Sequence, residues 1–370
     1  MRARRIALLA LALGACAGCA PLRYYAHVTH GQLALLAARE PVARIVADPA
    51  ADPVLRERLA DAQAARAFAS TRLHLPRNRS YTSYVALGRP YATWNVFAAP
   101  EFSVEPATHC MPFAGCVPYL GYFDEAHARA AAARLAARGN DTAIVGSAAY
   151  STLGWFADPI LSSMLRPGDE LAGVIFHELA HQYLYVKGDA TFNESWASFV
   201  HAQGLREWRA TRGFAPPDAP GIEHGDEAFT RHVLDLRERL RTLYASELDA
   251  GRLRRAKAIE IEAFRERHRA WRDARGGRET ARDAWVEGPL GNADLLPFGI
   301  YDRWKRAFAR LFELQEGDWS AFLACASELA RMPRAAREER LHALEAQAPR
   351  ARIDACPRAL ALRNDLRGGE

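Results

Sequence analysis

The segment that decides our reading of this chain is Glu170-Leu-Ala-Gly-Val-Ile-Phe-His177-Glu178-Leu-Ala-His181. Its apolar residues predict a buried helix, for which Asp169 is a favourable N-cap and Glu170 a favourable first-turn residue. Residues four apart lie on one face of a helix, so His177 and His181 can bind the same cation. Glu178 lies about 100° further around the axis, where it can move a proton instead of binding the metal. The pattern H-E-x-x-H therefore predicts a catalytic zinc site.

Glu194 is the candidate third ligand. A catalytic zinc site takes three protein ligands and leaves one position open. Twelve residues separate His181 from Glu194, which is enough for the chain to reverse direction and bring Glu194 back to the histidines. Asn193 is expected to cap a second helix. Two alternatives remain open: Asp189 as the ligand, and Glu194 as a residue that only favours the dipole of its helix. No third histidine follows at the metzincin spacing H-x-x-G-x-x-H. We expect one zinc ion, bound by His177, His181 and Glu194.

Two tyrosines are candidates for a further catalytic role. A hydroxyl that stabilises the oxyanion would assist a zinc hydrolase, and the candidates for it are Tyr301, in Phe298-Gly-Ile-Tyr-Asp-Arg, and Tyr150. The alternative for each is a packed aromatic residue. The apolar run at 142–147 predicts a strand, which either pairs with an extended substrate by strand addition or lies within the core.

Residues 1–19 have the pattern of an export signal. An apolar run too short for a membrane helix follows three arginines, which are Arg2, Arg4 and Arg5. The run ends in Cys16-Ala-Gly-Cys19, which resembles the lipobox of bacterial lipoproteins, with Cys19 favoured for lipidation and Cys16 the alternative. A plain secretory signal is the other reading. Pro21 stands where an inner-membrane retention aspartate would stand, so we expect a lipid-anchored protein of the cell envelope, in the outer membrane and facing the periplasm.

The net charge argues against one class of partner. The formal charge is +5, but three positive charges belong to the N-terminal arginines, which leaves 5 − 3 = +2. A surface that binds nucleic acid is typically far more basic than this. We therefore expect no nucleic-acid partner. The expected partners are a peptide or protein substrate and, through the lipid anchor, the membrane.

Four cysteines lie outside the signal, and an even number in an exported chain indicates disulfides. Cys110 and Cys116 flank a short loop, and Cys325 and Cys356 flank a C-terminal helical segment, so these are the expected pairs. Free buried thiols are the alternative. A zinc site made by these cysteines is disfavoured because no C-x-x-C spacing occurs among them.

The remaining periodicities predict an α+β chain that is mainly helical. Residues 20–40 are expected to begin as a tether and to run into an amphipathic helix. Further helices are expected at about residues 52–72, 124–138, 226–247, 250–275, 301–314, 318–331 and 333–347. Two runs of β-forming residues around a Gly-Arg-Pro turn predict a hairpin within 75–102. The charged segment 226–275 is expected to be an α-hairpin. We divide the chain into the signal (1–19), a catalytic part with a small sheet before the H-E-x-x-H helix (20–204) and a C-terminal helical region (205–370).

With Asn193-Glu194-Ser-Trp-Ala197 after H-E-x-x-H, the chain resembles the gluzincin peptidases, in which the glutamate of an N-E-x-x-A motif joins two histidines. It is also similar to a bacterial lipoprotein family labelled "putative aminopeptidase", at stretches that include Leu75-Pro-Arg-Asn-Arg-Ser-Tyr81, Trp94-Asn-Val-Phe97, Gly115-Cys-Val-Pro-Tyr119 and Tyr150-Ser-Thr-Leu-Gly-Trp-Phe156. This likeness reaches to about residue 200 and is weaker through 225–285. The resemblance implies a zincin-like fold and a metallopeptidase with His177, His181 and Glu194 as ligands and Glu178 as base.

The chain departs from the gluzincin aminopeptidases in two respects. Their G-x-M-E-N motif, which binds the free amine of the substrate, has no match here, and their interval between zinc histidine and zinc glutamate is longer. Aminopeptidase specificity is therefore an expectation from the resemblance alone. We expect a zinc-dependent peptide-bond hydrolase of the bacterial envelope, in which Glu178 is the general base for a zinc-activated water. The alternatives are an envelope amidohydrolase that is not a peptidase, and a lipoprotein binding or scaffold protein with a structural zinc site.

Overall fold

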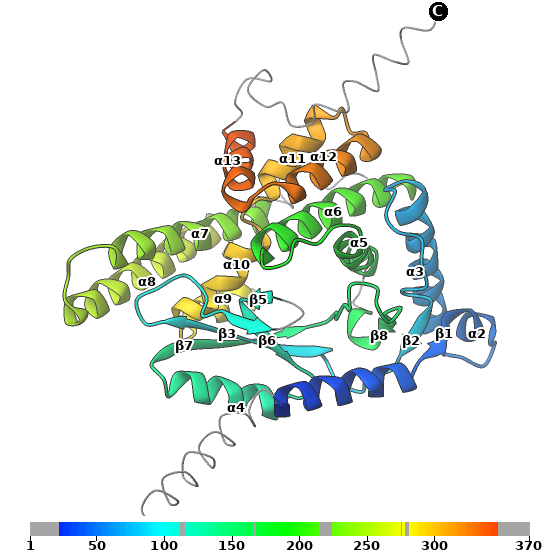
Figure 1. Cartoon of the computed structure of the whole chain (residues 1–370), viewed down its shortest axis with the longest axis horizontal. Coiled ribbons are helices and arrows are strands. Elements are labelled where there is room, and N and C mark those ends of the chain that lie inside the picture. Colours follow the sequence, from blue (N-terminus) through cyan, green and yellow to red (C-terminus); the bar gives the residue numbers. More distant parts are fainter. Residues whose placement is uncertain are drawn as a thin grey trace, which may run out of the picture.

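The computed structural model describes these parts of the chain: residues 22–111, 115–165, 168–214, 224–274, 276–277 and 281–346. The expected export signal and both lipidation candidates, Cys16 and Cys19, lie outside the described residues, so these expectations stay predictions. Within the described residues, every helix falls short of the length or the apolar character that crossing a bilayer requires. The architecture is α+β and mainly helical, as expected (Figure 1).

A three-stranded antiparallel sheet lies beside the candidate site. Its strands, in spatial order, are β6 (Tyr119–Tyr122), β3 (Thr93–Pro100) and β7 (Asn140–Ser147). Alternate residues of a strand point to opposite faces. Trp94 and Val96 of β3 pack against α4 (Glu125–Ala136), whereas Thr93 and Asn95 line a pocket on the other face. The strand expected before the H-E-x-x-H helix is β7, at an edge of this sheet.

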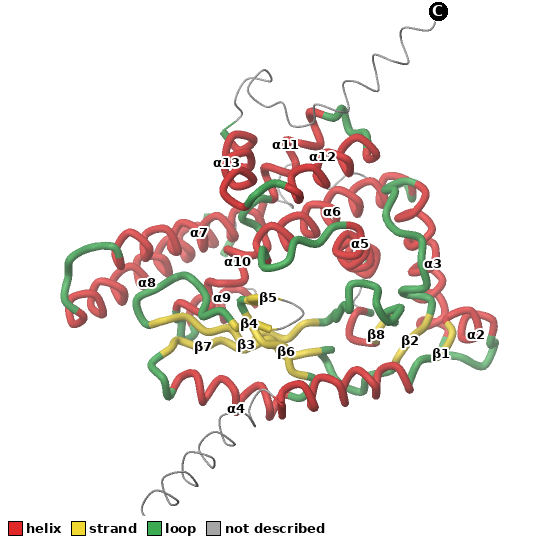
Figure 2. Tube along the Cα trace, viewed as in Figure 1, coloured by secondary structure: helices red, strands yellow, loops and turns green. Residues whose placement is uncertain are grey.

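The hairpin expected within 75–102 is wrong. β2 (Ser83–Val85) lies in a different sheet from β3, between β1 (Glu40–Pro41) and β8 (Ile160–Leu161). Figure 2 shows both sheets among the helices. The physical reason is that all eight residues of β3 pair with β7, whereas the three residues of β2 could offer only a short ladder.

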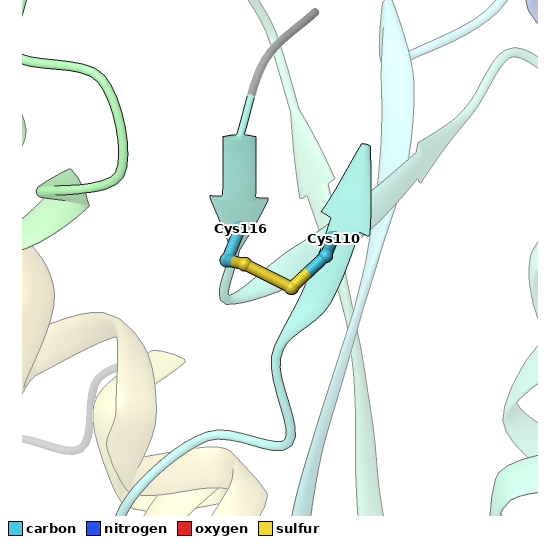
Figure 3. Close-up of a disulfide and its surroundings, with 2 residues drawn as sticks. All are labelled: Cys110 and Cys116. Carbon is cyan, nitrogen blue, oxygen red and sulfur yellow. A yellow bond between two sulfur atoms is a disulfide. The ribbon is translucent and has the colours of Figure 1, made fainter. Parts of the chain in front are cut away.

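A disulfide closes a small hairpin next to the larger sheet. β4 (His109–Met111) and β5 (Gly115–Val117) pair in antiparallel fashion, and Cys110 is bonded to Cys116 (Figure 3). This confirms the first expected cysteine pair. The second pair stays a prediction, because Cys356 lies outside the described part of the chain.

The motif residues lie on α5 (Glu170–Tyr183) and α6 (Ala190–Thr211). These helices pack closely, since a Cβ on Gly204 of α6 would lie 2.9 Å from the ring of Phe176 on α5. Asp169 precedes α5 as expected, but its carboxylate does not cap the helix. It accepts two hydrogen bonds, each of 2.7 Å, from Arg209 near the end of α6. On the N-terminal side lie a helix over residues 22–37, α2 (Val42–Ala47) and α3 (Pro53–Thr71).

The C-terminal region is helical, as expected. Its elements are α7 (His224–Tyr244), α8 (Ala250–Asp273), α9 (Ala281–Glu287), α10 (Leu296–Tyr301), α11 (Lys305–Leu314), α12 (Trp319–Arg331) and α13 (Arg334–Glu345). Short 3-10 helices occur at Ser162–Met164 and Asn292–Leu295.

Two groups of C-terminal helices pack in different ways. The helices α7 and α8 form the expected α-hairpin, with a separate core that includes Val233 and Phe264. The helices α11–α13 join the main core, in which Phe308 and Phe322 contact Trp196 of α6. Figure 1 shows them stacked on α6, on the side away from the sheet. The C-terminal helices therefore support the helix that carries Glu194.

Candidate metal centre

Three motif residues converge in the structure. Nε2 of His177 lies 3.1 Å from Nε2 of His181, and Oε2 of Glu194 lies 3.3 Å from each of these nitrogens. Ligand atoms at the corners of a tetrahedron around zinc, with bonds of about 2.0–2.1 Å, are separated by about 3.3–3.4 Å. The near-equal separations fit three ligands of one tetrahedral metal ion, and these residues form a group able to hold one.

The helix that carries Glu194 begins earlier than the sequence predicts. It starts at Ala190 with Asp189 as N-cap, because Oδ1 of Asp189 accepts a 3.1 Å hydrogen bond from a backbone N–H of the first turn. Asn193 therefore lies inside the helix, where its side-chain amide bonds the backbone N and O of Val186, both at 2.8 Å. Glu194 lies in the second turn. The effect of the helix dipole on a nearby charge falls off within the first turn. The alternative in which Glu194 only favours the dipole of its helix therefore does not fit its position.

Asp189, the alternative ligand, has other partners. Its Oδ2 accepts a 2.6 Å hydrogen bond from Arg337 of α13, while Oδ1 caps α6. Both side chains are buried, at 6% and 4% exposure. The structure thus brings Glu194 to the two histidines and places Asp189 in a buried ion pair.

Neighbours of Glu194 within the same motif hold its helix in place. Trp196 donates from Nε1 to a carbonyl of the H-E-x-x-H motif at 3.1 Å, which connects α6 to α5. Ser195 donates from Oγ to the carbonyl of Ile300 at 3.2 Å and accepts from the backbone N–H of Trp304 at 3.1 Å. Each polar residue of the Asn-Glu-Ser-Trp stretch therefore has a separate structural role.

The charges of the donor group suit a cation. Burial alone would raise the pKa of Glu194, but the imidazoles of His181 and His177 hold it well below its usual range. Burial alone would lower the pKa of His181, but the Glu194 carboxylate raises it. A metal ion would compete with this proton, because a ligating imidazole must be neutral. Nδ1 of His181 is buried and has no hydrogen-bond partner among the described residues.

Glu178 has the environment of a general base. Burial raises its pKa, and the carboxylates of Glu194 and Asp158 raise it further, whereas His177 and His181 lower it. The net direction is upward. A carboxyl group with a raised pKa is better matched to proton transfer near neutral pH than an ordinary glutamate.

The donor group lies in a pocket of about 440 Å³, lined by α5, α6 and the sheet. Both candidate tyrosines line this pocket. The ring centroid of Tyr301 lies 6.3 Å from that of His177 at an interplanar angle of 26°, which places Tyr301 beside the metal group. Among the described lining residues, Glu178 and Glu194 are the only carboxylates.

Sequence reasoning missed four further tyrosines among the described residues of this pocket, of which Tyr119 and Tyr185 lie near the donor group. Burial and the nearby carboxylate of Glu194 raise the pKa of both, and a side-chain hydrogen bond with Tyr301 partly lowers that of Tyr119. Tyr119 ends a stretch that the family resemblance had singled out, and Tyr185 follows His181 by four residues. Those signals could have identified both.

A family model described as "Putative aminopeptidase" matches residues 23–341, a range that includes every residue of the metal centre. Neither the curated proteins nor the solved structures contain a match to the chain.

Proposed function

The chain belongs to the "Putative aminopeptidase" family, and on that premise we propose that it is a zinc-dependent peptidase whose metal is held by His177, His181 and Glu194. The observation that carries this proposal is the triangle of donor atoms, with sides of 3.1, 3.3 and 3.3 Å. Two neutral imidazoles and one carboxylate are a ligand set of catalytic zinc sites. The zincin-like arrangement of α5 and α6 is part of this proposal.

A bound zinc ion supplies Lewis acidity and makes a nucleophile available at neutral pH. Glu178 takes a proton from the attacking water on its carboxylate and later passes a proton to the leaving amine. The hydroxyl of Tyr301, or that of Tyr150, donates a hydrogen bond to the oxyanion that develops at the scissile carbonyl. The position of Tyr301 beside His177 favours Tyr301 for this role.

A structural zinc site is the rival from another class. Structural sites are closed by four protein ligands, whereas the group found among the described residues has three. An amidohydrolase that is not a peptidase shares the site geometry, and substrate assays separate it from the peptidase. The family description supports the peptidase.

We extend the proposal to the cell envelope, with a lipid anchor on Cys19 or Cys16. The disulfide between Cys110 and Cys116 supports an oxidising compartment. Metabolic labelling with a fatty acid tests the anchor. Cys19→Ala should abolish labelling, whereas Cys16→Ala should keep it. The reverse result assigns the anchor to Cys16. If the wild-type protein is not labelled either, the proposal of a lipid anchor is wrong.

Zinc content is the first test of function. Purified wild type and Glu178→Gln should each hold one equivalent of zinc, whereas Glu194→Ala should lose it. Glu178→Gln should cleave peptides about 10²- to 10⁴-fold more slowly than wild type. If wild type binds no zinc when zinc is supplied, the metal assignment is wrong. If zinc is bound but Glu178→Gln cleaves as fast as wild type, Glu178 is not the general base.

The same assay addresses the aminopeptidase activity that the family description suggests. Each peptide is supplied with a free N-terminus and in N-acetylated form. An aminopeptidase loses activity on acetylation because the free amine is part of what it recognises. An endopeptidase cleaves both forms. Either result is compatible with the zinc peptidase. If the protein cleaves neither form of any peptide, the result contradicts the proposed peptidase function.

A further inference from the structure

The pocket also has a group of aromatic and aliphatic residues other than Tyr119, Tyr185 and Tyr301. We call this group the aromatic wall, and its members are Tyr24, Tyr25, Val28, Phe123 and Tyr150. The side chains that affect the pKa of Tyr24 belong to other tyrosines, and the one that affects the pKa of Tyr150 is Asp158. Those that affect Tyr119 and Tyr301 include Glu194 and Glu178. The aromatic wall therefore borders the same pocket, and the metal-centre carboxylates that affect Tyr119 and Tyr301 do not affect Tyr24 or Tyr150 in the same way.

The helix over residues 22–37 builds one side of the aromatic wall. Nε2 of His27 accepts a 3.0 Å hydrogen bond from the backbone N–H of Phe123. A Cβ on Gly31 would lie 2.2 Å from the Phe123 ring, so glycine permits this close approach. Tyr24 packs edge-on against Tyr122 at 5.4 Å. These contacts hold the helix against the sheet and keep its inner face on the pocket.

The loop after β7 builds the other side of the aromatic wall, next to Phe123. Tyr150 packs edge-on against Phe123, with ring centroids 5.0 Å apart. Asp158, which is 1% exposed, accepts hydrogen bonds from N and Oγ1 of Thr152 at 2.9 and 2.6 Å. The loop that carries Tyr150 is therefore tied to a buried carboxylate, and both sides of the aromatic wall are held in place.

The aromatic wall presents apolar rings and hydroxyl groups but no charge. Burial raises the pKa of the Tyr150 hydroxyl to about 12, so it stays neutral at physiological pH. An apolar or aromatic side chain gains free energy by leaving water for such a surface. A lysine or aspartate side chain would lose its hydration there, and none of the wall residues carries an opposite charge.

We propose that the aromatic wall is the subsite for a large uncharged side chain next to the scissile bond, and that Val28 helps to set this preference. This inference rests on the proposed peptidase function. Val28 is the member of the wall that is aliphatic and partly buried on the N-terminal helix. A carboxylate at this position would face the bound side chain, whereas Thr29, one residue further, is exposed on the outside of the same helix.

The test compares peptides that differ only in the residue on one side of the scissile bond, first on the N-terminal and then on the C-terminal side. Zinc-loaded wild type should cleave the phenylalanine and leucine peptides at least about tenfold faster in kcat/KM than the lysine and aspartate peptides, on one of the two sides. Val28→Glu should shift this ratio by about tenfold or more toward lysine. Thr29→Glu adds the same charge to the same helix and should leave the ratio unchanged.

Binding supplies a readout that does not depend on turnover. Zinc-loaded Glu178→Gln should bind the phenylalanine peptide at least about tenfold more tightly than the lysine peptide. If Val28→Glu does not fold, Val28→Trp replaces it. A larger residue narrows the subsite, so Val28→Trp should weaken cleavage of the phenylalanine peptide more than that of an alanine peptide.

Equal cleavage of charged and apolar peptides by wild type overturns the subsite and leaves the peptidase standing. Equal shifts in Val28→Glu and Thr29→Glu also overturn it, because the effect then comes from net charge. If zinc-loaded wild type cleaves no peptide at all, the proposed function fails and the subsite fails with it.

Discussion

Asp189 and Arg337 form a buried ion pair, with 2.6 Å between Oδ2 of Asp189 and a terminal guanidinium nitrogen of Arg337. Asp189 caps the helix that carries Glu194, and Arg337 lies on α13. Arg337 also donates to the carbonyl of Met332 at 2.8 Å and lies over the ring of Phe192 at 5.0 Å. The last helix of the described chain is therefore bonded directly to the start of the Glu194 helix.

Asp189→Asn should destabilise the fold by about 3 kcal/mol, because it leaves the Arg337 charge buried without its counter-charge. Asparagine still caps a helix, so the loss reports the ion pair. Chemical denaturation of the zinc-free and zinc-loaded forms measures it. Glu338→Gln is the control, since it breaks an exposed pair with Arg334 and should cost less than about 1 kcal/mol. Equal losses in the two variants would contradict the role assigned to the buried pair.

Tyr301→Phe should lower kcat by about 100-fold or more while zinc content stays at one equivalent, because only the hydroxyl that donates to the oxyanion is removed. Tyr150→Phe should affect kcat much less, since Tyr150 lies in the aromatic wall and packs against Phe123. Steady-state kinetics on one peptide, with zinc analysis of each variant, distinguish the two. A larger loss for Tyr150→Phe would reassign the role to Tyr150.

Gly204→Ala should destabilise the protein by about 1–3 kcal/mol, the usual cost of adding a methyl group to a packed core. Its Cβ would lie 2.7 Å from Cδ1 of Leu73 and 2.9 Å from Cδ2 of Phe176. Alanine is otherwise favoured over glycine in a helix, so a loss of stability can only come from crowding. Thermal unfolding measures it, and a variant more stable than wild type would show that the two helices can separate at little cost.

Asp169→Asn should remove a pH-dependent contribution to stability of about 1 kcal/mol. The hydrogen-bonded guanidinium of Arg209 holds the pKa of Asp169 below its ordinary value of 3.8. A depressed folded-state pKa stabilises the fold above the unfolded-state value, and this stabilisation is lost as the pH falls through the folded-state value. The difference between wild type and Asp169→Asn should therefore be constant from pH 7 to about pH 5 and shrink below pH 4.

That difference is followed by denaturant unfolding of both proteins between pH 3 and pH 7. Conditions of constant ionic strength keep screening of the partly exposed pair unchanged. A difference that grows as the pH falls would show that Asp169 is not stabilised as the ionised form.

Local sequence determined the part of the site that depends on helix geometry. Residues four apart lie on the same face of a helix, whatever the fold of the rest of the chain. His177 and His181 could therefore be predicted as metal ligands, and Glu178 as the base, from their spacing alone. The same holds for α4, which was expected at about 124–138, and for the α7–α8 hairpin, since both depend on neighbouring residues.

Tertiary structure decided the features that join distant segments. The strand partners of β3 come from β6 and β7, and the competition between these partners and β2 could not be judged from local β-propensity. The start of α6 depended on whether Asp189 or Asn193 supplied the cap, and the bonds of Asn193 to Val186 decided this.

The chain by itself therefore determined that His177 and His181 could bind one metal ion, because their spacing along a helix is a local property. Only the folded structure decided what surrounds them. Arg337 contacts Asp189 although 148 positions of sequence separate them. Tyr24 and Tyr150 line one pocket, although Tyr24 precedes the strands of the larger sheet in the sequence and Tyr150 follows them. Such contacts depend on how whole elements pack, and packing is set by the sum of many weak, non-directional apolar contacts that no short motif encodes.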